Sequence, residues 1–482
     1  MDIYTPGWVR DAIFYQIFPD RFARSTRVAK PNYLEAWDAP PTLRGYKGGD
    51  LYGIIEHLDH IESLGANALY LTPIFQAASN HRYNTHDYYQ VDPMLGGTAA
   101  LRELLDTCHA RGIRVILDGV FNHAGRGFFP FHDLLETGPQ SPYRDWFHVH
   151  SFPLNAYHPY QKPGYSGWWE LASLPKFNTT TPAVREFLWN VATYWLEFGV
   201  DGWRLDAPGE IDDDSFWQEL RRRCRAINPD AYLVGEVWGD ARRWLQGDQF
   251  DAVMHYELTR VLFGFVAAET LNREQIGKGA YRQIASLSAE EFGKAIDRLY
   301  GKYHPAVTDV QFTLLGSHDP ARVLTLFGED ESALRLALLF QMTYLGAPCI
   351  YYGDEIGLTG NHDPDNRRAM PWHTPKSWNT ELFTYTQSLI RLRREHAALR
   401  RGSFKPLLAR DGIYAYARVL GDECWIVALN VNKHTVKLRL PTIKLPHHHS
   451  ECRDILNGQC ADIGQQQLSY DIAARSGALL QF

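Results

Sequence analysis

Short apolar runs rich in β-branched or aromatic residues alternate along the chain with segments of helical period. Strand, helix and strand at this spacing predict parallel β/α units. Eight such strands fit a closed (β/α)8 barrel, the TIM barrel, in which functional side chains lie at the carboxyl ends of the strands. The eight runs cover residues 12–19, 68–75, 114–121, 201–210, 231–238, 251–258, 312–319 and 347–355.

Two parts of the chain depart from this alternation. Residues 123–176, after the third predicted strand, show no helix of convincing period and are rich in aromatic residues, Pro and Gly. Segments of this length inside compact domains are usually functional, so we expect an inserted domain that forms one wall of a cleft. Residues 399–482 alternate like antiparallel strands and predict a C-terminal β-sandwich. The barrel is then expected to comprise residues 1–122 and 177–398.

Charge and composition exclude several classes of function. The 482 residues carry a net charge of −7, which argues against an extended nucleic-acid interface. No apolar run approaches the roughly 18 residues of a membrane span, and the first residues lack the pattern of a secretion signal. Six cysteines without C-x-x-C spacing are typical of reduced thiols. We therefore expect a cytoplasmic protein that binds neither nucleic acid nor membrane.

The fourth apolar run carries two charged residues. Arg204 and Asp206 are two positions apart and therefore point to the same face of a strand. Because an unpaired buried charge is costly, the two side chains are expected to pair. A purely structural ion pair satisfies the same logic. Polar residues at the ends of other predicted strands favour a functional site instead, namely Asp118, Glu236, His318 and Asp319.

These carboxylates suit one reaction in particular. Glycoside hydrolysis with retention of configuration needs a nucleophilic carboxylate and a protonated carboxylic acid roughly 5–5.5 Å apart. Asp206 and Glu236 follow adjacent predicted strands and could supply that separation. Arg204 would keep Asp206 ionised, whereas the apolar neighbours of Glu236 would favour its neutral form. Asp319 is a third carboxylate, expected to support the distorted sugar ring of the transition state.

Four segments resemble the ordered signatures of the α-amylase superfamily of glycoside hydrolases. They are DGVFNH from residue 118, DGWRLDAP from 201, GEVW from 235 and LLGSHD from 314. YQIFPDRF (15–22) and HRYNTHDYYQVDP (81–93) are similar to further segments of that superfamily. The resemblance extends over essentially the whole chain. It implies a (β/α)8 barrel, a domain inserted after strand three and a C-terminal β-domain.

The resemblance also implies a role for each matching residue. Asp206 corresponds to the nucleophile, Glu236 to the general acid/base and Asp319 to the carboxylate that stabilises the transition state. Arg204 corresponds to the arginine that orients the nucleophile, and Asp118 to a structural carboxylate. The other matching positions correspond to residues that contact sugar. Tyr83 would lie under the glucose at the cleaved end, His123 and His318 would bind its hydroxyls, and Asp363 and Arg367 would hold the next glucose.

Within the superfamily, the chain is most similar to neopullulanases, cyclomaltodextrinases and maltogenic amylases. The similar segments are SLPKFNT (173–179), GGDLYGIIEHLDHI (48–61) and Trp238, which follows the acid/base. These bacterial, usually cytoplasmic relatives cleave α-1,4 and often α-1,6 links in maltodextrins, cyclodextrins or pullulan. They usually carry an N-terminal β-domain that closes a dimer, whereas here the first predicted strand begins almost at once. Substrate size and oligomeric state stay open, a homodimer included.

The acceptor side departs from these relatives. Ala207, Pro208 and Gly209 replace the usual Val-Ala-Asn, and Gly239 replaces a His. Proline restricts the backbone and glycine removes a side chain, so the acceptor pocket should differ in shape. These changes favour a branched, α-1,6-linked substrate.

We expect no cofactor and no required metal. The loop RFARSTRVAKPN (21–32) lacks the run of Asn and Asp that binds calcium in many relatives. Asp50 alone is a poor site for an ion that takes six to eight oxygen ligands. Asn122 matches a calcium ligand of typical α-amylases but is expected to act only through hydrogen bonds. The run His447–His449 lacks spaced partners and indicates a solvated loop rather than a zinc site.

The predicted function is that of a retaining α-glucan hydrolase. It would cleave α-1,6 links, α-1,4 links or both in malto-oligosaccharides, pullulan or cyclodextrins through a covalent glycosyl-enzyme. A transglycosylase of the same family and a non-catalytic carbohydrate-binding barrel are the alternatives, although a pure binder need not keep the three carboxylates. Core packing stays an alternative for Tyr83 and Trp238, and a surface ion pair for Asp363 with Arg367.

Overall fold

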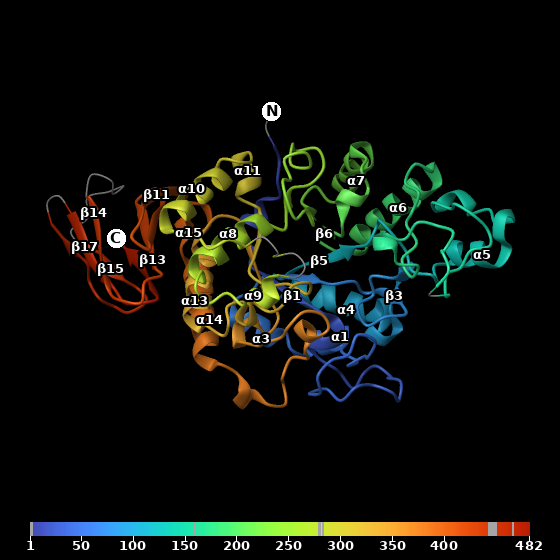
Figure 1. Ribbon diagram of the computed structural model, residues 1–482, viewed down its shortest axis with the longest axis horizontal. Coiled ribbons are helices and arrows are strands. Elements are labelled where there is room, and N and C mark those ends of the chain that lie inside the picture. The colour runs from blue at the N-terminus through green and yellow to red at the C-terminus, as the bar shows by residue number, and fades with distance from the viewer. Residues whose placement is uncertain (1–2, 159, 278–280, 282–283, 442–450, 465–466) are drawn as a thin grey trace.

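The computed structural model describes residues 3–158, 160–277, 281, 284–441, 451–464 and 467–482. In this part of the chain, eight parallel strands form a barrel at the centre of an elongated molecule (Figure 1). Their order is β8-β7-β6-β5-β2-β1-β10-β9, and pairing of Met254 with Phe312 closes the sheet. The predicted barrel is confirmed. The strands are β1 (Phe14–Ile17), β2 (Ala68–Leu71), β5 (Arg114–Gly119), β6 (Gly202–Leu205), β7 (Tyr232–Gly235), β8 (Ala252–Val253), β9 (Phe312–Leu314) and β10 (Ala347–Tyr351).

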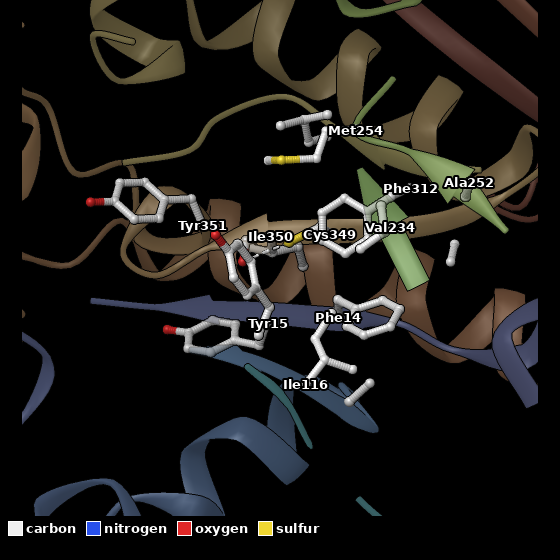
Figure 2. Close-up of a cluster of buried hydrophobic side chains, with 14 of the residues drawn as sticks. Phe14, Tyr15, Ile116, Val234, Ala252, Met254, Phe312, Cys349, Ile350 and Tyr351 are labelled. Carbon is white, nitrogen blue, oxygen red and sulfur yellow. Dashed lines mark hydrogen bonds between the residues drawn. The ribbon is translucent and has the colours of Figure 1, made fainter. Parts of the chain in front are cut away.

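Side chains fill the barrel interior. Figure 2 shows Phe14, Ile116, Val234 and Phe312, from four different strands, in one buried cluster with Met254. Because both faces of a parallel barrel strand are covered, the strands read as continuous apolar runs rather than as alternating patterns. This explains why the apolar runs predict the strands so well.

Amphipathic helices cover the outside of the barrel. The longer ones are α4 (Gly97–Ala110), α6 (Pro182–Phe198), α7 (Asp214–Ile227), α8 (Tyr256–Val266), α10 (Ala289–Tyr300), α13 (Glu331–Thr343) and α14 (Thr380–Glu395). Shorter helices are α1 (Pro19–Phe22), α2 (Leu51–Glu56), α3 (Leu58–Leu64), α9 (Arg273–Ile276), α11 (Pro305–Thr308), α12 (Val323–Leu326) and α15 (Ala397–Arg401).

One apolar run contributes a strand of only two residues. Residues 251–258 contribute only β8, because α8 already begins at Tyr256. Asp251, which directly precedes β8, forms ion pairs with Arg221 and Arg225, at 2.8 and 2.6 Å. The apolar character of the second half of the run therefore belongs to a buried helix, which periodicity over so few residues cannot distinguish from a strand.

The segment between β5 and α6 contains a helix that the sequence pattern does not predict. Helix α5 (Phe129–Thr137) has Pro130 in its first turn and buries Phe131 and Leu134. Isolated backbone pairing of His123 with Lys176 brings the two ends of the segment together, and Gly167 pairs with Pro175 within its last part. A small antiparallel pair, β3 (Phe75–Ala77) with β4 (Thr85–Val91), precedes it. In Figure 1 this segment forms the end of the molecule opposite the C-terminal strands.

The C-terminal strands form two antiparallel sheets, as the sequence predicts. One contains β11 (Ser403–Arg410), β12 (Ile413–Leu420), β13 (Glu423–Asn430), β18 (Ser476–Gln481) and β15 (Arg453–Asp454); the other contains β14 (Val436–Pro441), β17 (Gln467–Ile472) and β16 (Asp462–Ile463). Side chains from both sheets, such as Ile426 and Leu468, form a separate apolar core. The histidine run 447–449 lies outside the described residues.

Candidate active site

The guanidinium of Arg204 lies at the centre of a cluster of carboxylates. Its Nη1 atom is 2.8 Å from Asp118 Oδ1 and 2.8 Å from Asp206 Oδ1, and its Nη2 atom is 2.9 Å from Glu236 Oε1. Arg204 is completely buried. The planar fork of an arginine can contact several carboxylates at once, which a lysine cannot do with the same geometry. The pairing predicted for Arg204 and Asp206 is present, and Glu236 joins it.

Strand register brings these side chains together. Asp118 on β5 is the direct neighbour of Arg204 on β6. The ladder continues past the strands, because the backbone N–H of Asp206 donates to Gly119 and that of Glu236 donates to Leu205. Glycine at 202 is required by the close approach of β7, since a Cβ there would lie 2.2 Å from the Tyr232 carbonyl oxygen. All four charged groups therefore emerge at the carboxyl end of the barrel.

The backbone after Asp206 holds Glu236. Ala207 adopts a left-handed conformation, with φ of 39° and ψ of 49°. Its N–H donates to Glu236 Oε2 at 3.1 Å. A non-glycine residue at this φ is strained, and such strain persists only where the surroundings enforce it. The turn thus fixes the second oxygen of Glu236, a contact that the apolar sequence around Glu236 does not indicate.

The environments of the two carboxyls order their protonation. Burial raises the pKa of Glu236 to about 8, and neighbouring Asp206 and Asp319 raise it as well. Burial also raises the pKa of Asp206 to about 7, against the lowering effect of Arg204. Because the pair interacts strongly, it titrates in two steps. Between the two steps one proton stays in the site, and Glu236 is the better place for it.

A chain of polar side chains leads from Gln16 on β1 to Asp118. The Gln16 amide lies 2.8 Å from His318 Nδ1, which leaves the proton of the ring on Nε2, beside the Tyr83 hydroxyl. Tyr83 in turn donates to Asp118 Oδ2 at 2.8 Å, as Tyr70 does at 2.6 Å. Burial lowers the pKa of His318 well below its usual range, so the ring is neutral. Asp118 is thus held by two hydroxyls and Arg204.

Asp319 lies at the more open side of the cluster. Its side chain is one-third exposed, and its Oδ1 atom lies 3.3 Å from His318 Nε2 and 3.9 Å from Arg367 Nη2. Arg367 also contacts Asp363 at 3.2 Å and donates from Nε to the carbonyl oxygen of His318. The Asp363–Arg367 pair is therefore joined to the carboxylate cluster through Asp319 and His318.

His123 and Trp238 are the remaining predicted site residues. The completely buried His123 ring lies 3.1 Å from the Tyr83 carbonyl oxygen through Nε2, and burial lowers its pKa to about 4. Trp238 stacks on Tyr256 with the ring centroids 3.5 Å apart and the planes at 14°. The structure thus joins His123 to the cluster through Tyr83 and places Trp238 two residues after Glu236, against Tyr256.

Several residues of the site have no role predicted from the sequence. They are Gln16, Tyr70, His81, Trp168 and Tyr256, and each contacts a predicted site residue. Gln16 and Tyr70 lie on β1 and β2, and His81 follows β3. Gln16 and His81 also lie within the segments YQIFPDRF and HRYNTHDYYQVDP, so these segments could have indicated them.

Asp50, considered above as a poor calcium ligand, pairs with an ammonium group. Asp50 is completely buried, and Lys30 Nζ lies 2.9 Å from its Oδ2 atom. Backbone N–H groups of Ser25 and Gly53 donate to the same carboxylate. These residues do not fit a cation. Among the described residues, no group of three His, Cys, Asp or Glu side chains could hold a metal ion, and no described helix is long and apolar enough to cross a membrane.

Known proteins are similar to this chain over nearly its whole length. A cyclomaltodextrinase from a Bacillus species is 46% identical, over 91% of this chain and 76% of its own. Among solved structures, the debranching enzyme from Nostoc punctiforme is 48% identical with a TM-score of 0.92, and the match covers 100% of both chains. A cyclic α-maltosyl-(1→6)-maltose hydrolase from Arthrobacter globiformis is 36% identical with a TM-score of 0.88, again over 100% of both chains.

Family models agree with these matches and confirm the resemblance found in the sequence. Residues 404–473 match the neopullulanase-like C-terminal domain. Residues 16–402 match the alpha amylase catalytic domain, so this chain belongs to the alpha-amylase family of glycoside hydrolases.

Proposed function

We propose that this protein is a retaining α-glucan hydrolase with Asp206 as nucleophile and Glu236 as general acid/base. The observation that carries the proposal is the sharing of one guanidinium by these two carboxyls. Arg204 stabilises the ionised form of the group that attacks, while burial keeps the other group protonated for the leaving oxygen. Asp319 would stabilise the positive charge that develops on the sugar ring.

Around this core, the remaining side chains would position the substrate. Tyr83 and the two histidines at 123 and 318 would contact the glucosyl unit that is cleaved. Asp363 and Arg367 would hold the next unit, and Trp238 would pack on the acceptor side, beside the strained turn at Ala207. Asp118 would keep Arg204 in place.

For the linkage, we infer α-1,6 hydrolysis. The supporting observation is that the Nostoc debranching enzyme and the Arthrobacter hydrolase, whose names refer to debranching and to an α-(1→6) compound, match this chain from end to end. The turn after Asp206 also differs from the sequence usual in cyclomaltodextrinases. We also infer a cytoplasmic location, by similarity to the intracellular maltogenic amylase of Bacillus subtilis, which is 37% identical. A homodimer remains part of the proposal.

Asp206→Asn tests the catalytic assignment. The amide removes the attacking charge but keeps the shape, so we expect a native circular dichroism spectrum and a fall in kcat by several orders of magnitude. Asp212→Asn is the control, because Asp212 is an exposed aspartate near the same turn. A substitution at Gln249, which is buried, would not be a suitable control. Activity of Asp206→Asn within about tenfold of the parent would refute the assignment.

The linkage is tested with a malto-oligosaccharide that carries one long α-1,6-linked arm. Release of the intact arm and the intact stem would demonstrate debranching. Shortened arms and maltose would instead show α-1,4 hydrolysis. Products longer than the substrate would reveal transfer of the glycosyl group to a second sugar, the transglycosylase alternative.

A further inference from the structure

One tryptophan of the inserted segment is displayed to solvent. Trp169 is 76% exposed, whereas Trp195, Trp203, Trp217 and Trp425 are almost completely buried. An indole ring left in water forgoes the burial free energy that a tryptophan usually gains. The position of Trp169 therefore requires an explanation beyond packing within the described chain.

The backbone at this tryptophan is strained. Trp169 has φ of 50° and Glu170 has φ of 61°, so two consecutive non-glycine residues adopt the left-handed conformation. Such residues persist only when the surrounding structure enforces them, and they concentrate at functional sites. Strain at an exposed side chain is not needed for a stable core.

Hydrogen bonds hold this turn in its strained form. The N–H of Trp168 donates to Leu174 at 2.9 Å, and that of Leu174 donates back to Leu171 at 3.0 Å. The Tyr165 hydroxyl donates to the carbonyl oxygen of Ala172 at 2.6 Å. The exposed ring is thus presented by a fixed scaffold, and a preorganised contact loses little entropy on binding.

A row of parallel rings joins Trp169 to the carboxylate site. Trp169 stacks on Trp168 with centroids 4.6 Å apart and planes at 11°, and Trp168 stacks on His123 at 5.2 Å and 17°. His123 contacts Tyr83 as described above. Lys176, in the same inserted segment, pairs at 3.0 Å with Glu210 from the turn after Asp206. The free face of Trp169 therefore lies along the wall of the site rather than on a remote surface.

We propose that Trp169 is a stacking platform for a glucosyl unit of the substrate chain outside the link that is cleaved. The C–H face of a pyranose ring is apolar and matches an indole in size, while its hydroxyls stay in water. This inference rests on the proposed α-glucan substrate and adds a binding position to it. It makes affinity depend on chain length, because short substrates do not reach the ring.

The test compares Trp169→Ala with Trp169→Phe, which keeps an aromatic face. Phe129→Ala is the matched control, since Phe129 is 63% exposed in the same segment and packs on Tyr143 outside the ring row. Binding of maltotriose and maltohexaose is measured by calorimetry in the Asp206→Asn background, where turnover is expected to be several orders of magnitude lower. We expect Trp169→Ala to raise the Kd for maltohexaose about threefold to tenfold and that for maltotriose much less. Trp169→Phe should recover most of the loss.

Other outcomes are distinguishable. Equal Kd values for Trp169→Ala and its parent background, on both sugars, would overturn the platform even if hydrolysis is confirmed. A loss of dimer in sedimentation on Trp169→Ala without any change in sugar Kd would overturn it too, and would assign the ring to contact with a second copy. If the wild-type enzyme hydrolyses no α-glucan while maltohexaose still binds through Trp169, the proposed function fails and the platform stands.

Discussion

At the scale of the residue, Arg204 determines the chemistry that the site can perform. One buried cation faces three carboxyls, so they cannot all be ionised without excess negative charge in a buried place. Burial alone would lower the pKa of Arg204, yet Asp118 and Glu236 raise it well above its usual value. The arginine therefore stays charged, and the variable charge of the site resides on Asp206 and Glu236.

This arrangement predicts a bell-shaped pH dependence of kcat/KM. The nucleophile must be ionised, so activity should rise as pH passes about 7, the pKa of Asp206. The acid must be protonated, so activity should fall as pH passes about 8, the pKa of Glu236. Initial rates on one substrate across this range check the profile. Asp319 raises both values, so Asp319→Asn should move both limbs of its residual activity to lower pH; unmoved limbs would contradict the electrostatic account.

At the scale of the element, two buried arginines bind carbonyl groups around the end of helix α13, and one of them, Arg418, joins the C-terminal sheet to the barrel. Helix α13 ends at Thr343, where carbonyl groups of its last turn have no partner within the helix. Arg393 from α14 donates to Met342 and Tyr344, and Arg418 from β12 donates to Gly402 and contacts Thr343. Burial lowers the pKa of Arg393 to about 9 and that of Arg418 to about 10.

Arg418→Met should therefore destabilise the whole protein. The substitution keeps the apolar stem but leaves the carbonyl oxygens of Thr343, Leu399 and Gly402 without this donor, at a cost of about 3 kcal/mol or more. Calorimetric unfolding measures the change. Arg410→Met on neighbouring β11 is the control, because the Arg410 side chain is 63% exposed. An equal melting temperature for the two variants would show that the buried contacts contribute nothing.

At the scale of the whole molecule, a lysine takes the place that a metal could take in fixing the long loop before α2. Lys30 Nζ contacts both Asp50 and the carbonyl oxygen of Met94, so these groups tie the loop to the start of α2 and to the segment before α4. We expect EDTA to change neither the activity nor the melting temperature. Lys30→Met should lower the melting temperature, because the buried Asp50 would lose its charged partner. A clear loss of activity or stability in EDTA would contradict this.

Much of the architecture could be predicted from the sequence, because it depends on neighbouring residues. Buried parallel strands appear in the sequence as apolar runs, and turn-forming residues mark where strands end. The eight strands and the antiparallel C-terminal sheets could therefore be predicted. The motifs then pointed to the strand ends where Asp206, Glu236 and Asp319 stand. Helix α5 and the early start of α8 could not be predicted, because they depend on tertiary packing rather than on the hydrophobic period of the sequence.

Only the tertiary structure decided which residues far apart in the chain contact one another. Closure of the barrel places Gln16 beside His318, and strand register places the Glu236 carboxyl group beside Nη2 of Arg204. Neither distance nor hydrogen-bond direction is encoded by spacing along a chain. The left-handed backbone of Ala207 and Trp169 is likewise set by surroundings, since isolated Ala and Trp avoid that conformation. The sequence by itself determined which groups the site contains, and the closed barrel decided which of them touch.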